Sequence, residues 1–540
     1  MAYVVTQNCC NDATCVAVCP VDCIHPTPDE AGYAAAEMLY INPSTCIDCG
    51  ACADVCPVDA IVPVDALALE NKRYREINAD YFARNPQPAR PVFARAEPTA
   101  SGNSAASAGA PAIEPLRVAI VGSGPAAFYA AEELLARRDV VAEVTMIERL
   151  PAAGGLVRFG VAPDHWHTKL MGRVFDRTTR RTGFSLYLGV EVGRDITQGE
   201  LLEHHHAVLY ASGAPDDRRL GIPGEDLPGS HSASEFVAWY NGHPEKADAV
   251  FDLSASRAVV VGNGNVALDV ARVLVTDPKA LAGTDIADHA LHALTDGEVR
   301  EVVVLGRRRP ASAAFTTPEL LALGSVPGVD VVVEGAVAIS PNATIKEVIL
   351  AEYSQARPLA GNKRIVLRFD TVPVEIAGDG RVKSVRVTDP TGHAKDTIDC
   401  GLVFRAIGYR GCPLPDLPFD ECTGTVPNVG GRVMDPHLEG RLIGCYVAGW
   451  IKRGPSGVIG TNRYCAAETV MAIAADHRAG ALPSPTADGS SLSALIRRRQ
   501  PGALDIEAWR AVDRYERMVG RRQNRPRVKV IDRWDGHRAR

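Results

Sequence analysis

Cysteine is the residue type whose placement in this sequence first points to chemistry. Nine of the fourteen cysteines lie between Cys9 and Cys56, and the other five are scattered over the rest of the 540 residues. The first residues do not resemble a secretory signal, so we expect a cytoplasmic chain in which disulfides are not favoured. A dense cysteine cluster in such a chain indicates metal binding.

The second half of the cysteine cluster has the spacing of a bacterial iron–sulfur site. It reads Cys46-x2-Cys49-x2-Cys52-x3-Cys56-Pro57. Three thiolates this close together can hold one four-iron cluster, and the fourth, placed before proline, reaches a second cluster. The stretch therefore predicts half of a two-cluster site.

The first half repeats this spacing with one change. It reads Cys9-x2-Asp12-x2-Cys15-x3-Cys19-Pro20, so an aspartate stands at the second ligand position. Cross-ligation between the two halves predicts one [4Fe-4S] cluster on four thiolates, those of Cys19, Cys46, Cys49 and Cys52. The other site keeps three thiolates, those of Cys9, Cys15 and Cys56.

Three thiolates leave the type of the other cluster open. They suit a [3Fe-4S] cluster, whose missing corner needs no ligand, and we favour this type. The alternative is a [4Fe-4S] cluster in which Asp12 holds a labile fourth iron through oxygen. Cys10 and Cys23 fall off the spacing and are expected to be free thiols, with Cys10 as an alternative ligand.

With these motifs, residues 1–65 resemble the bacterial seven-iron, two-cluster ferredoxins. The stretches 19–24 (CPVDCI) and 56–61 (CPVDAI) show the internal duplication of that family. The loop between Cys9 and Cys15 is shorter than is usual there. The resemblance implies an α+β ferredoxin-like domain that carries single electrons.

A different pattern begins at residue 116, where an apolar strand runs into a glycine-rich turn and a helix expected at 126–136. Such a turn lets a dinucleotide pyrophosphate approach the backbone and the helix N-terminus. The next strand ends on Glu148, an acid placed for a ribose 2′-hydroxyl, which fits FAD or NAD and disfavours NADP. The turn residues predicted to bind this cofactor are Gly122, Gly124, Pro125 and Ala126.

A second unit of the same form follows the strand 258–261 and opens a helix expected at 266–275. Its next strand, 302–306, ends not on an acid but on Arg307-Arg308-Arg309. Guanidinium groups at this point suit a 2′-phosphate, so we predict NADP rather than NAD. The turn residues predicted at this site are Asn263, Gly264, Asn265 and Val266.

The segments 154–165 and 449–460 resemble the flavin-site segments of the adrenodoxin reductase family, and the resemblance covers about residues 116–475. It implies an α/β architecture with two Rossmann-like dinucleotide-binding domains, the NADP domain being inserted into a discontinuous FAD domain. The FAD contacts implied by the resemblance include Leu156, Val192, Trp450, Gly457, Val458 and Ile459. The implied NADP contacts include Arg218, Arg307, Arg308, Glu319 and Gly457. Asp164 and His165 are expected near the flavin ring, in a proton or electron-gating role or simply as positioning residues.

These boundaries divide the chain into six predicted parts: a two-cluster ferredoxin domain (1–70), a polar arm and flexible linker (71–115), the first part of the FAD domain (116–215), the NADP domain (216–405), the second part of the FAD domain (406–480) and a C-terminal extension (481–540). The linker is rich in Ala, Ser, Gly and Pro. The extension is rich in arginine, and we expect it to be a solvated surface.

Together these expectations describe an NADPH–ferredoxin oxidoreductase. NADPH would give a hydride to FAD, and single electrons would pass to the clusters of the chain's own ferredoxin domain, to an external ferredoxin or to another one-electron acceptor. A flexible tether gives the ferredoxin domain a high effective concentration, so we expect it to dock on the flavin domain. No C-x-x-C or C-x4-C motif follows either nucleotide turn, which disfavours disulfide reductases.

Two other interpretations stay open. One is the electron-input subunit of a larger enzyme, as in glutamate synthase, and the other is a non-catalytic iron–sulfur redox sensor. The net charge of −7 and the lack of a long apolar stretch give no reason to expect nucleic acid or a membrane as a partner. We expect a monomer.

Overall fold

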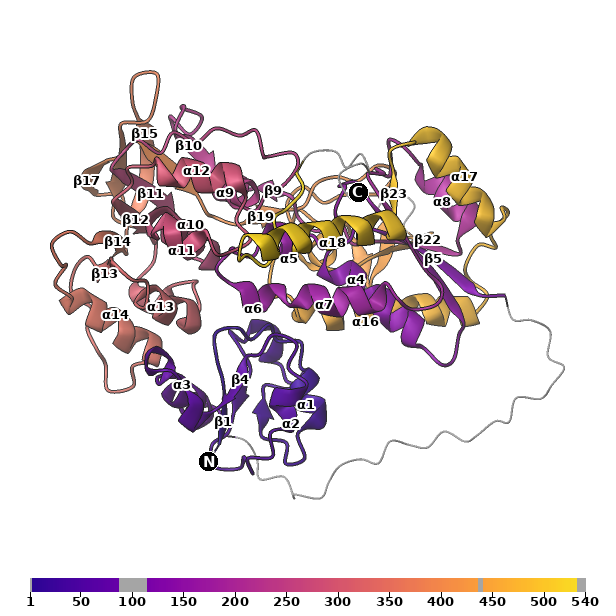
Figure 1. Ribbon diagram of the computed structural model, residues 1–540, viewed down its shortest axis with the longest axis horizontal. Helices are drawn as coiled ribbons and strands as arrows, with labels where there is room; N and C mark the ends of the chain where they lie inside the picture. Colours follow the sequence, from indigo (N-terminus) through magenta and orange to yellow (C-terminus); the bar gives the residue numbers. More distant parts are fainter. Residues whose placement is uncertain (1, 87–113, 436–439, 532–540) are drawn as a thin grey trace.

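The computed structural model describes residues 2–86, 114–435 and 440–531, which form an N-terminal module and two larger lobes (Figure 1). Of the arm and flexible linker expected at 71–115, residues 87–113 lie outside the described residues. None of the helices in the described ranges is long and apolar enough to cross a membrane.

The N-terminal module follows the duplication of its sequence. Each half supplies a strand, a helix and a strand, namely β1 (Tyr3–Val5), α1 (Thr14–Val18) and β2 (Ile24–His25), then β3 (Tyr40–Ile41), α2 (Ala51–Asp54) and β4 (Ile61–Pro63). β1 pairs with β4 and β2 pairs with β3, both antiparallel. The two halves therefore interlock, and each cysteine run lies on a helix and its flanking loops.

α3 (Tyr74–Arg84) closes one side of the module. Its buried Asn78 accepts hydrogen bonds from the amides of Val5 (3.2 Å) and Ile41 (2.9 Å) and donates to the carbonyl of Val5 (2.9 Å). These groups belong to β1 and β3. The helical part of the segment that was expected to be a polar arm is therefore packed into the module.

The first lobe is built on an eight-stranded sheet of order β20-β21-β22-β8-β5-β6-β7-β23. The five strands from β22 to β7 run parallel and are mostly apolar, as expected of strands covered on both faces. The strands are β5 (Leu116–Val121), β6 (Ala142–Glu148), β7 (Phe184–Leu188), β8 (Ala207–Tyr210), β20 (Asn428–Val429), β21 (Arg432–Asp435), β22 (Gly440–Val447) and β23 (Leu504–Asp505). Two distant stretches of sequence thus complete one sheet.

The second lobe is built on a six-stranded, all-parallel sheet of order β10-β18-β11-β12-β14-β13. Its strands are β10 (Ser230–Ser232), β11 (Arg257–Val261), β12 (Glu301–Leu305), β13 (Val329–Val333), β14 (Lys363–Arg368) and β18 (Leu402–Arg405). An antiparallel sheet is added by β15 (Val372–Ala377), β16 (Ser384–Thr388) and β17 (Ala394–Asp399). The chain enters and leaves this lobe through β9 (Asp216–Asp217) and β19 (Tyr409–Arg410), which pair with each other.

Helices cover both sheets. In the first lobe they are α4 (Pro125–Ala136), α5 (Leu156–Phe159), α6 (Trp166–Lys169), α7 (Met171–Thr178), α8 (Gln198–His204), α15 (Trp450–Arg453), α16 (Thr461–Arg478), α17 (Gly489–Arg499) and α18 (Ile506–Arg522). In the second lobe they are α9 (Ala233–Tyr240), α10 (Asn265–Val275), α11 (Pro278–Leu281), α12 (Asp288–Thr295), α13 (Thr317–Leu323) and α14 (Ile345–Gln355). The prediction of parallel α/β sheets beside a small N-terminal domain is confirmed.

The N-terminal module packs against both lobes, with α3 beside α14 (Figure 1). Arg73, the N-cap residue of α3, forms a bidentate ion pair with Glu352 on α14, at 2.7 and 2.6 Å. Glu37 accepts hydrogen bonds from the amide of Thr317 (2.8 Å) and from Lys346 (2.6 Å). Docking was expected on the flavin domain, which is the first lobe. The module contacts the second lobe as well.

The C-terminal extension, expected to be a solvated surface, is instead part of the fold. β23 pairs antiparallel with β7, and α18 buries Trp509, Val512 and Glu516. Glu516 has no exposed surface and forms a bidentate ion pair with Arg158 of α5, at 2.5 and 3.0 Å. The prediction was wrong because it weighed the arginine content and not the helical spacing of the buried positions.

Replacing Glu516 by alanine should destabilise the fold, because Arg158 would stay buried without its counter-charge and Arg527 would keep only Asp513. Breaking a buried pair costs about 3–5 kcal/mol, and we expect a lower midpoint of chemical unfolding. The control is Glu507→Ala on the same helix. Glu507 forms an exposed ion pair with Arg510, and its loss should change the free energy of unfolding by no more than about 0.5 kcal/mol. Equal midpoints for the two variants would contradict the structural role of the C-terminal helix.

Candidate functional site

The first glycine-rich turn lies between β5 and α4. Gly122 has a φ of +105°, and a Cβ there would lie 2.6 Å from the carbonyl oxygen of Ala211, so a side chain does not fit. Gly124 caps α4, and Pro125 is the first residue of the helix. The strand, the turn and the helix N-terminus together have the geometry of a pyrophosphate cradle.

Two segments that are distant in sequence approach this turn closely. A Cβ at Gly155 would lie 2.7 Å from the Cα of Gly124. A Cβ at Gly449, the residue before Trp450, would lie 2.7 Å from the Cβ of Ala126. Glycine is therefore required on both sides of the turn, and the structure brings the starts of α5 and α15 together there.

Glu148 lies at the end of β6, beside the turn, and is buried. Its carboxylate accepts hydrogen bonds from the amide (3.0 Å) and hydroxyl (2.8 Å) of Ser123 and from the amide of Leu150 (2.9 Å). Burial raises the pKa of this carboxyl group. Protein donors thus fix the orientation of the acid next to the cradle.

The other residues predicted on the flavin side lie on nearby loops and helix ends. Leu156 begins α5 and is partly exposed. Val192 forms an isolated bridge with Ile196 in the loop after β7. Residues 457–459 precede α16, which packs on α4.

The second glycine-rich turn lies between β11 and α10. Gly264 caps α10, and Asn265 begins the helix and accepts a hydrogen bond from the amide of Thr316 (2.8 Å). The side-chain Nδ2 of Asn263 is buried and has no hydrogen-bond partner among the described residues. An unpaired buried donor is costly, so this amide is suited to an acceptor atom of a ligand. Val266 lies on the first turn of the helix.

Arg307 and Arg308 follow β12, the neighbour of β11 in the sheet. Val261 at the end of β11 stands opposite Leu305 at the end of β12, so the arginines come at the same sheet edge as the turn. Both arginine side chains are exposed. Arg218 is also exposed and lies where the chain crosses between the lobes.

His165 lies where the N-terminal module and both lobes meet. It precedes α6 of the first lobe, and its Nε2 is 3.7 Å from Oε2 of Glu319 on α13 of the second lobe. Nε2 of Gln7, from the module, lies 3.4 Å from the same histidine nitrogen and donates to Glu319 (3.2 Å). A residue predicted on the flavin side and one predicted on the NADP side are therefore neighbours, and the module reaches both.

Asp164 forms a bidentate ion pair with Arg272 of α10, at 2.7 and 3.1 Å. Burial alone would raise the pKa of Asp164, but the guanidinium holds that pKa well below its usual range. Asp269, Glu319 and His165 offer three metal-ligand atoms within 4.8 Å of one another. Because Arg272 contacts both of these carboxylates, its positive charge disfavours a cation there.

The predicted thiolate ligands form two groups in the module. Burial is the largest cause that raises the pKa of Cys15 in one group and of Cys52 in the other, and the charges of neighbouring thiols add to it. Cys9 and Cys56 act on Cys15, as does the more distant Cys52, whereas Cys19 and Cys46 act on Cys52. These are the groups that cross-ligation would use.

The donor set suits iron–sulfur clusters. The cysteines of the described residues are all free, and three of the predicted ligands accept backbone N–H bonds on sulfur. These bonds run from Leu39 to Cys9 (3.5 Å), from Cys23 to Cys19 (3.4 Å) and from Ala60 to Cys56 (3.3 Å). Amides directed at sulfur stabilise thiolates and tune the clusters that they hold.

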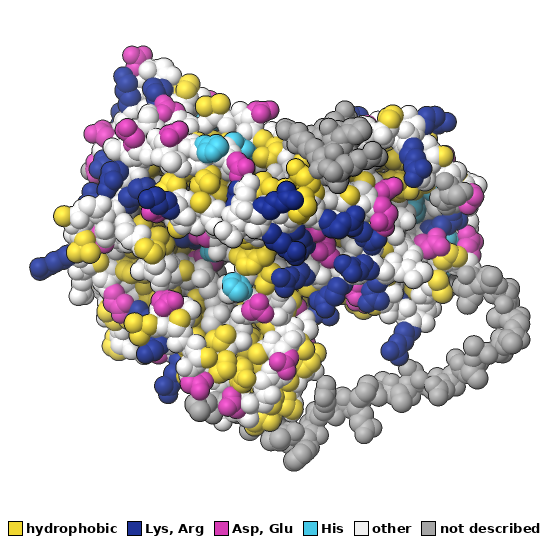
Figure 2. Space-filling model, in the orientation of Figure 1, with side chains coloured by type: hydrophobic (Ala, Val, Ile, Leu, Met, Phe, Trp, Pro, Cys, Tyr) yellow, Lys and Arg dark blue, Asp and Glu magenta, His cyan; other side chains and the backbone are white. Residues whose placement is uncertain are grey.

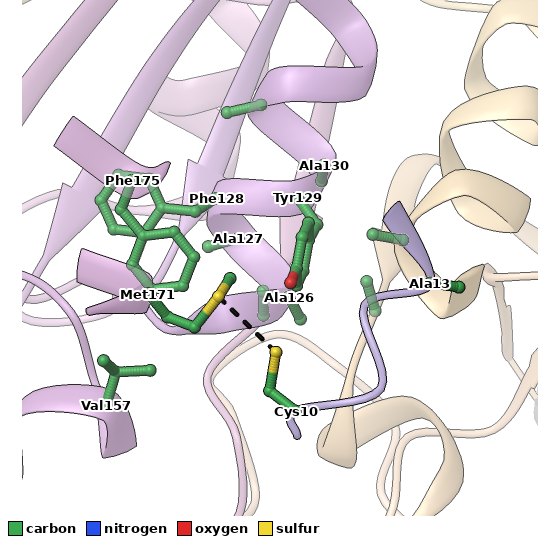
Figure 3. Close-up of a cluster of buried hydrophobic side chains, with 14 of the residues drawn as sticks. Cys10, Ala13, Ala126, Ala127, Phe128, Tyr129, Ala130, Val157, Met171 and Phe175 are labelled. Atoms are coloured by element: carbon green, nitrogen blue, oxygen red, sulfur yellow. Dashed lines mark hydrogen bonds between the residues drawn. The ribbon is translucent and has the colours of Figure 1, made fainter. Parts of the chain in front are cut away.

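The first cysteine loop also packs against the first lobe (Figure 3). Cys10 is buried, with its Sγ 3.7 Å from Sδ of Met171 on α7, and its carbonyl accepts from the amide of Gly460 (2.7 Å). A Cβ at Gly460 would lie 2.2 Å from the carbonyl carbon of Asn11. Since the thiol of Cys10 is directed at Met171, the contact favours its prediction as a free thiol.

Sequence reasoning missed Asp269, Arg272 and Gln7. Asp269 and Arg272 stand three residues apart on α10, whose other residues after the first are apolar. Charges that share one face of an otherwise buried helix need partners, and this signal could have found them. Gln7 had no such signal, because it is a neutral residue in a short loop after β1.

Comparison with known proteins defines the class. Residues 116–455 match the family model described as pyridine nucleotide-disulphide oxidoreductase, and residues 39–62 match that of a 4Fe-4S binding domain. The chain is thus a pyridine nucleotide oxidoreductase with an attached iron–sulfur domain.

Over 98% of its length the chain is 50% identical to a probable ferredoxin/ferredoxin–NADP reductase of Mycobacterium tuberculosis, covering 94% of that protein. A protein of the same description from Mycobacterium leprae is 48% identical, with 98% and 96% of the two chains covered. The structure of Mycobacterium tuberculosis FprA in complex with NADPH is 42% identical, with a TM-score of 0.72 over 78% of this chain and 98% of that one. The chain belongs to the ferredoxin/ferredoxin–NADP reductase family, which confirms the fusion inferred from its sequence motifs.

Gly460→Ala should loosen the contact between the N-terminal module and the first lobe. The φ of −70° suits alanine, so the added methyl group would act through its clash with the backbone of Asn11. Overpacking of about 1–3 kcal/mol weakens association by about fivefold to about 150-fold. The measurement is the affinity of the module for the lobes after cleavage of an engineered protease site in the linker.

Gly172→Ala on α7 is the matched control, because no atom lies within 4 Å of the Cβ it adds. That variant should retain the affinity of the unmodified protein. If Gly460→Ala retained it too, the contact at Asn11 would not contribute to docking.

Replacing Arg307 and Arg308 by alanine should raise the KM for NADPH and leave the KM for NADH unchanged. Each charge-assisted hydrogen bond is worth about 1.5–3 kcal/mol, so we expect an increase of roughly tenfold or more. Steady-state kinetics with the two nucleotides make the comparison within one variant. An equal rise for both would mean that the arginines do not read the 2′-phosphate.

Proposed function

We propose that this chain is an NADPH–ferredoxin oxidoreductase that takes a hydride from NADPH onto FAD and passes single electrons to the clusters of its own N-terminal module, to an external ferredoxin, or to both. When bound, FAD exchanges two electrons with the nicotinamide and releases them singly, and the clusters carry one electron at a time. One observation carries the proposal. The module, the flavin-side segment and the NADP-side helix contact one another through Gln7, His165 and Glu319.

We assign the FAD site to the first lobe. The turn at Gly122 to Ala126 would receive the pyrophosphate, and Glu148 would receive a ribose hydroxyl. The close approach at Gly155 and Gly449 supports this, because it places the starts of α5 and α15 beside the turn. The eight-stranded sheet combines strands from residues 116–210 with strands from 428–447, as a discontinuous FAD domain requires.

We assign the NADP site to the second lobe. The unpaired Nδ2 of Asn263 would donate to the dinucleotide at the turn, while Arg307 and Arg308 would bind the 2′-phosphate. Glu319 would lie on the nicotinamide side, since it contacts His165 at the boundary with the first lobe. Hydride transfer would then take place between the two sheet edges.

We assign a [4Fe-4S] cluster to Cys19, Cys46, Cys49 and Cys52, and we favour a [3Fe-4S] cluster on Cys9, Cys15 and Cys56. The carboxylate of Asp12 supports the three-iron type, because it accepts hydrogen bonds from the hydroxyl and the amide of Thr14. A carboxylate engaged in this way is less available to a fourth iron.

We infer that Asp164 and His165 act by positioning. Asp164 holds Arg272 through two hydrogen bonds, which leaves its oxygens committed to the ion pair. His165 faces Glu319 and Gln7 and so lines the approach between the lobes and the module. The fold thus supplies orientation at this junction, and the redox chemistry belongs to the cofactors.

Anaerobic EPR with visible absorption tests the function and the cluster types together. The isolated protein should show a nearly isotropic three-iron signal, and NADPH should remove that signal and bleach the flavin band. Dithionite reduction is the control for the total cluster content. If NADPH bleached the flavin while clusters reducible by dithionite stayed oxidised, electrons would not pass from flavin to module.

A further inference from the structure

We propose that electrons leave the N-terminal module through an exposed surface beside the second cysteine group, and that this surface binds a basic one-electron acceptor protein. We call it the exit face and define it by Tyr3, Ile47, Asp48, Cys49 and Asp54. The inference rests on the function proposed above. It adds the surface on which the partner binds and the sign of the partner's charge.

The first cysteine group faces the reductase lobes. Its loop is held by the hydrogen bond from Gly460 to Cys10 and by the contact with Met171. Arg463 of α16 donates to the carbonyl of Asp12 and to the hydroxyl of Thr14, at 3.2 and 3.3 Å. None of the three predicted ligands in this group is exposed in the described structure. The first lobe therefore covers this side of the module, and the group is less accessible to a protein in solution than an exposed cysteine would be.

The second cysteine group reaches the surface. Cys49 is the exposed member of the seven predicted ligand cysteines. Ile47, two residues earlier, has 58% of its surface exposed, and residues 43–45 are exposed as well. An exposed aliphatic side chain beside an exposed ligand position offers the apolar centre of a small interface.

Tyr3 completes this apolar centre and acidic groups surround it. A Cβ at Gly50 would lie 3.0 Å from the Tyr3 hydroxyl, so the ring leans on the turn that follows Cys49. Asp48 directly precedes Cys49, Asp54 ends α2 two residues after Cys52, and both carboxylates are exposed. An aromatic and aliphatic centre with a charged rim is the usual anatomy of a transient protein interface.

The charge of the module selects a basic partner. Residues 1–70 contain ten Asp and Glu side chains and no Lys or Arg. In Figure 2 the part of the module away from α3 shows acidic and hydrophobic side chains, whereas Lys and Arg side chains appear on the α3 segment and gather over α7 and α18 of the first lobe. Opposite charge steers encounter and like charge opposes it, so an acidic protein would be repelled from the exit face.

The test measures binding of oxidised cytochrome c, a basic haem protein, to the complete holoenzyme at low and at physiological salt. Asp54→Lys should raise the Kd about tenfold at low salt, with a smaller effect as salt screens the charge. Ile47→Ser should also raise the Kd, but with little dependence on salt. EPR after dithionite reduction verifies that each variant retains its clusters.

Asp29→Lys is the matched control, since it makes the same charge change on an exposed residue between β2 and β3, outside the exit face. Its Kd should stay within about twofold of the unmodified protein. If Asp29→Lys weakened binding as much as Asp54→Lys, or if neither exit-face variant weakened it, the exit face would be refuted. Reduction of the clusters by NADPH without cytochrome c tests the proposed function separately, so the two failures are distinguishable.

Discussion

Arg272 places a guanidinium in the interior with only 3% of its surface exposed. A charge in such a position is stable only when counter-charges are in contact with it, and Asp164, Asp269 and Glu319 supply them. Asp164 belongs to the first lobe and the other three to the second, so this group of charges fixes how the lobes meet. His165 follows Asp164 directly, and its position at the junction therefore depends on the same ion pair.

A second group of buried charges strengthens the joint between the lobes. Lys169 of the first lobe contacts Asp285 of the second lobe (2.6 Å), and Lys529 of the C-terminal segment contacts the other oxygen of that carboxylate (3.0 Å). Asn241 accepts hydrogen bonds from both lysines. Because desolvated charges are costly when unpaired, these contacts specify one arrangement of the lobes and the C-terminal segment.

The N-terminal module is positioned differently, by shape as much as by charge. Gly460 lets the backbone of Asn11 approach so closely that no side chain fits between them, while Cys10 packs on Met171 (Figure 3). The ion pairs at the edge of this contact, such as Arg73 with Glu352, are exposed and individually weak. A docked module with one side against the lobes and one cysteine group at the surface can connect an internal electron source to an external acceptor.

The sequence by itself determined the chemistry. The cysteine runs and the two glycine turns are short local patterns, and Glu148 and the arginines stand at the end of the strand that follows each turn, so sequence order reveals them as candidates. Only the tertiary structure decided the junction of Gln7, His165 and Glu319 and the burial of Glu516 against Arg158, which is 358 residues away. Such contacts join side chains whose separation along the chain carries no pattern. Their stability comes from mutual desolvation, which exists only once the chain has folded.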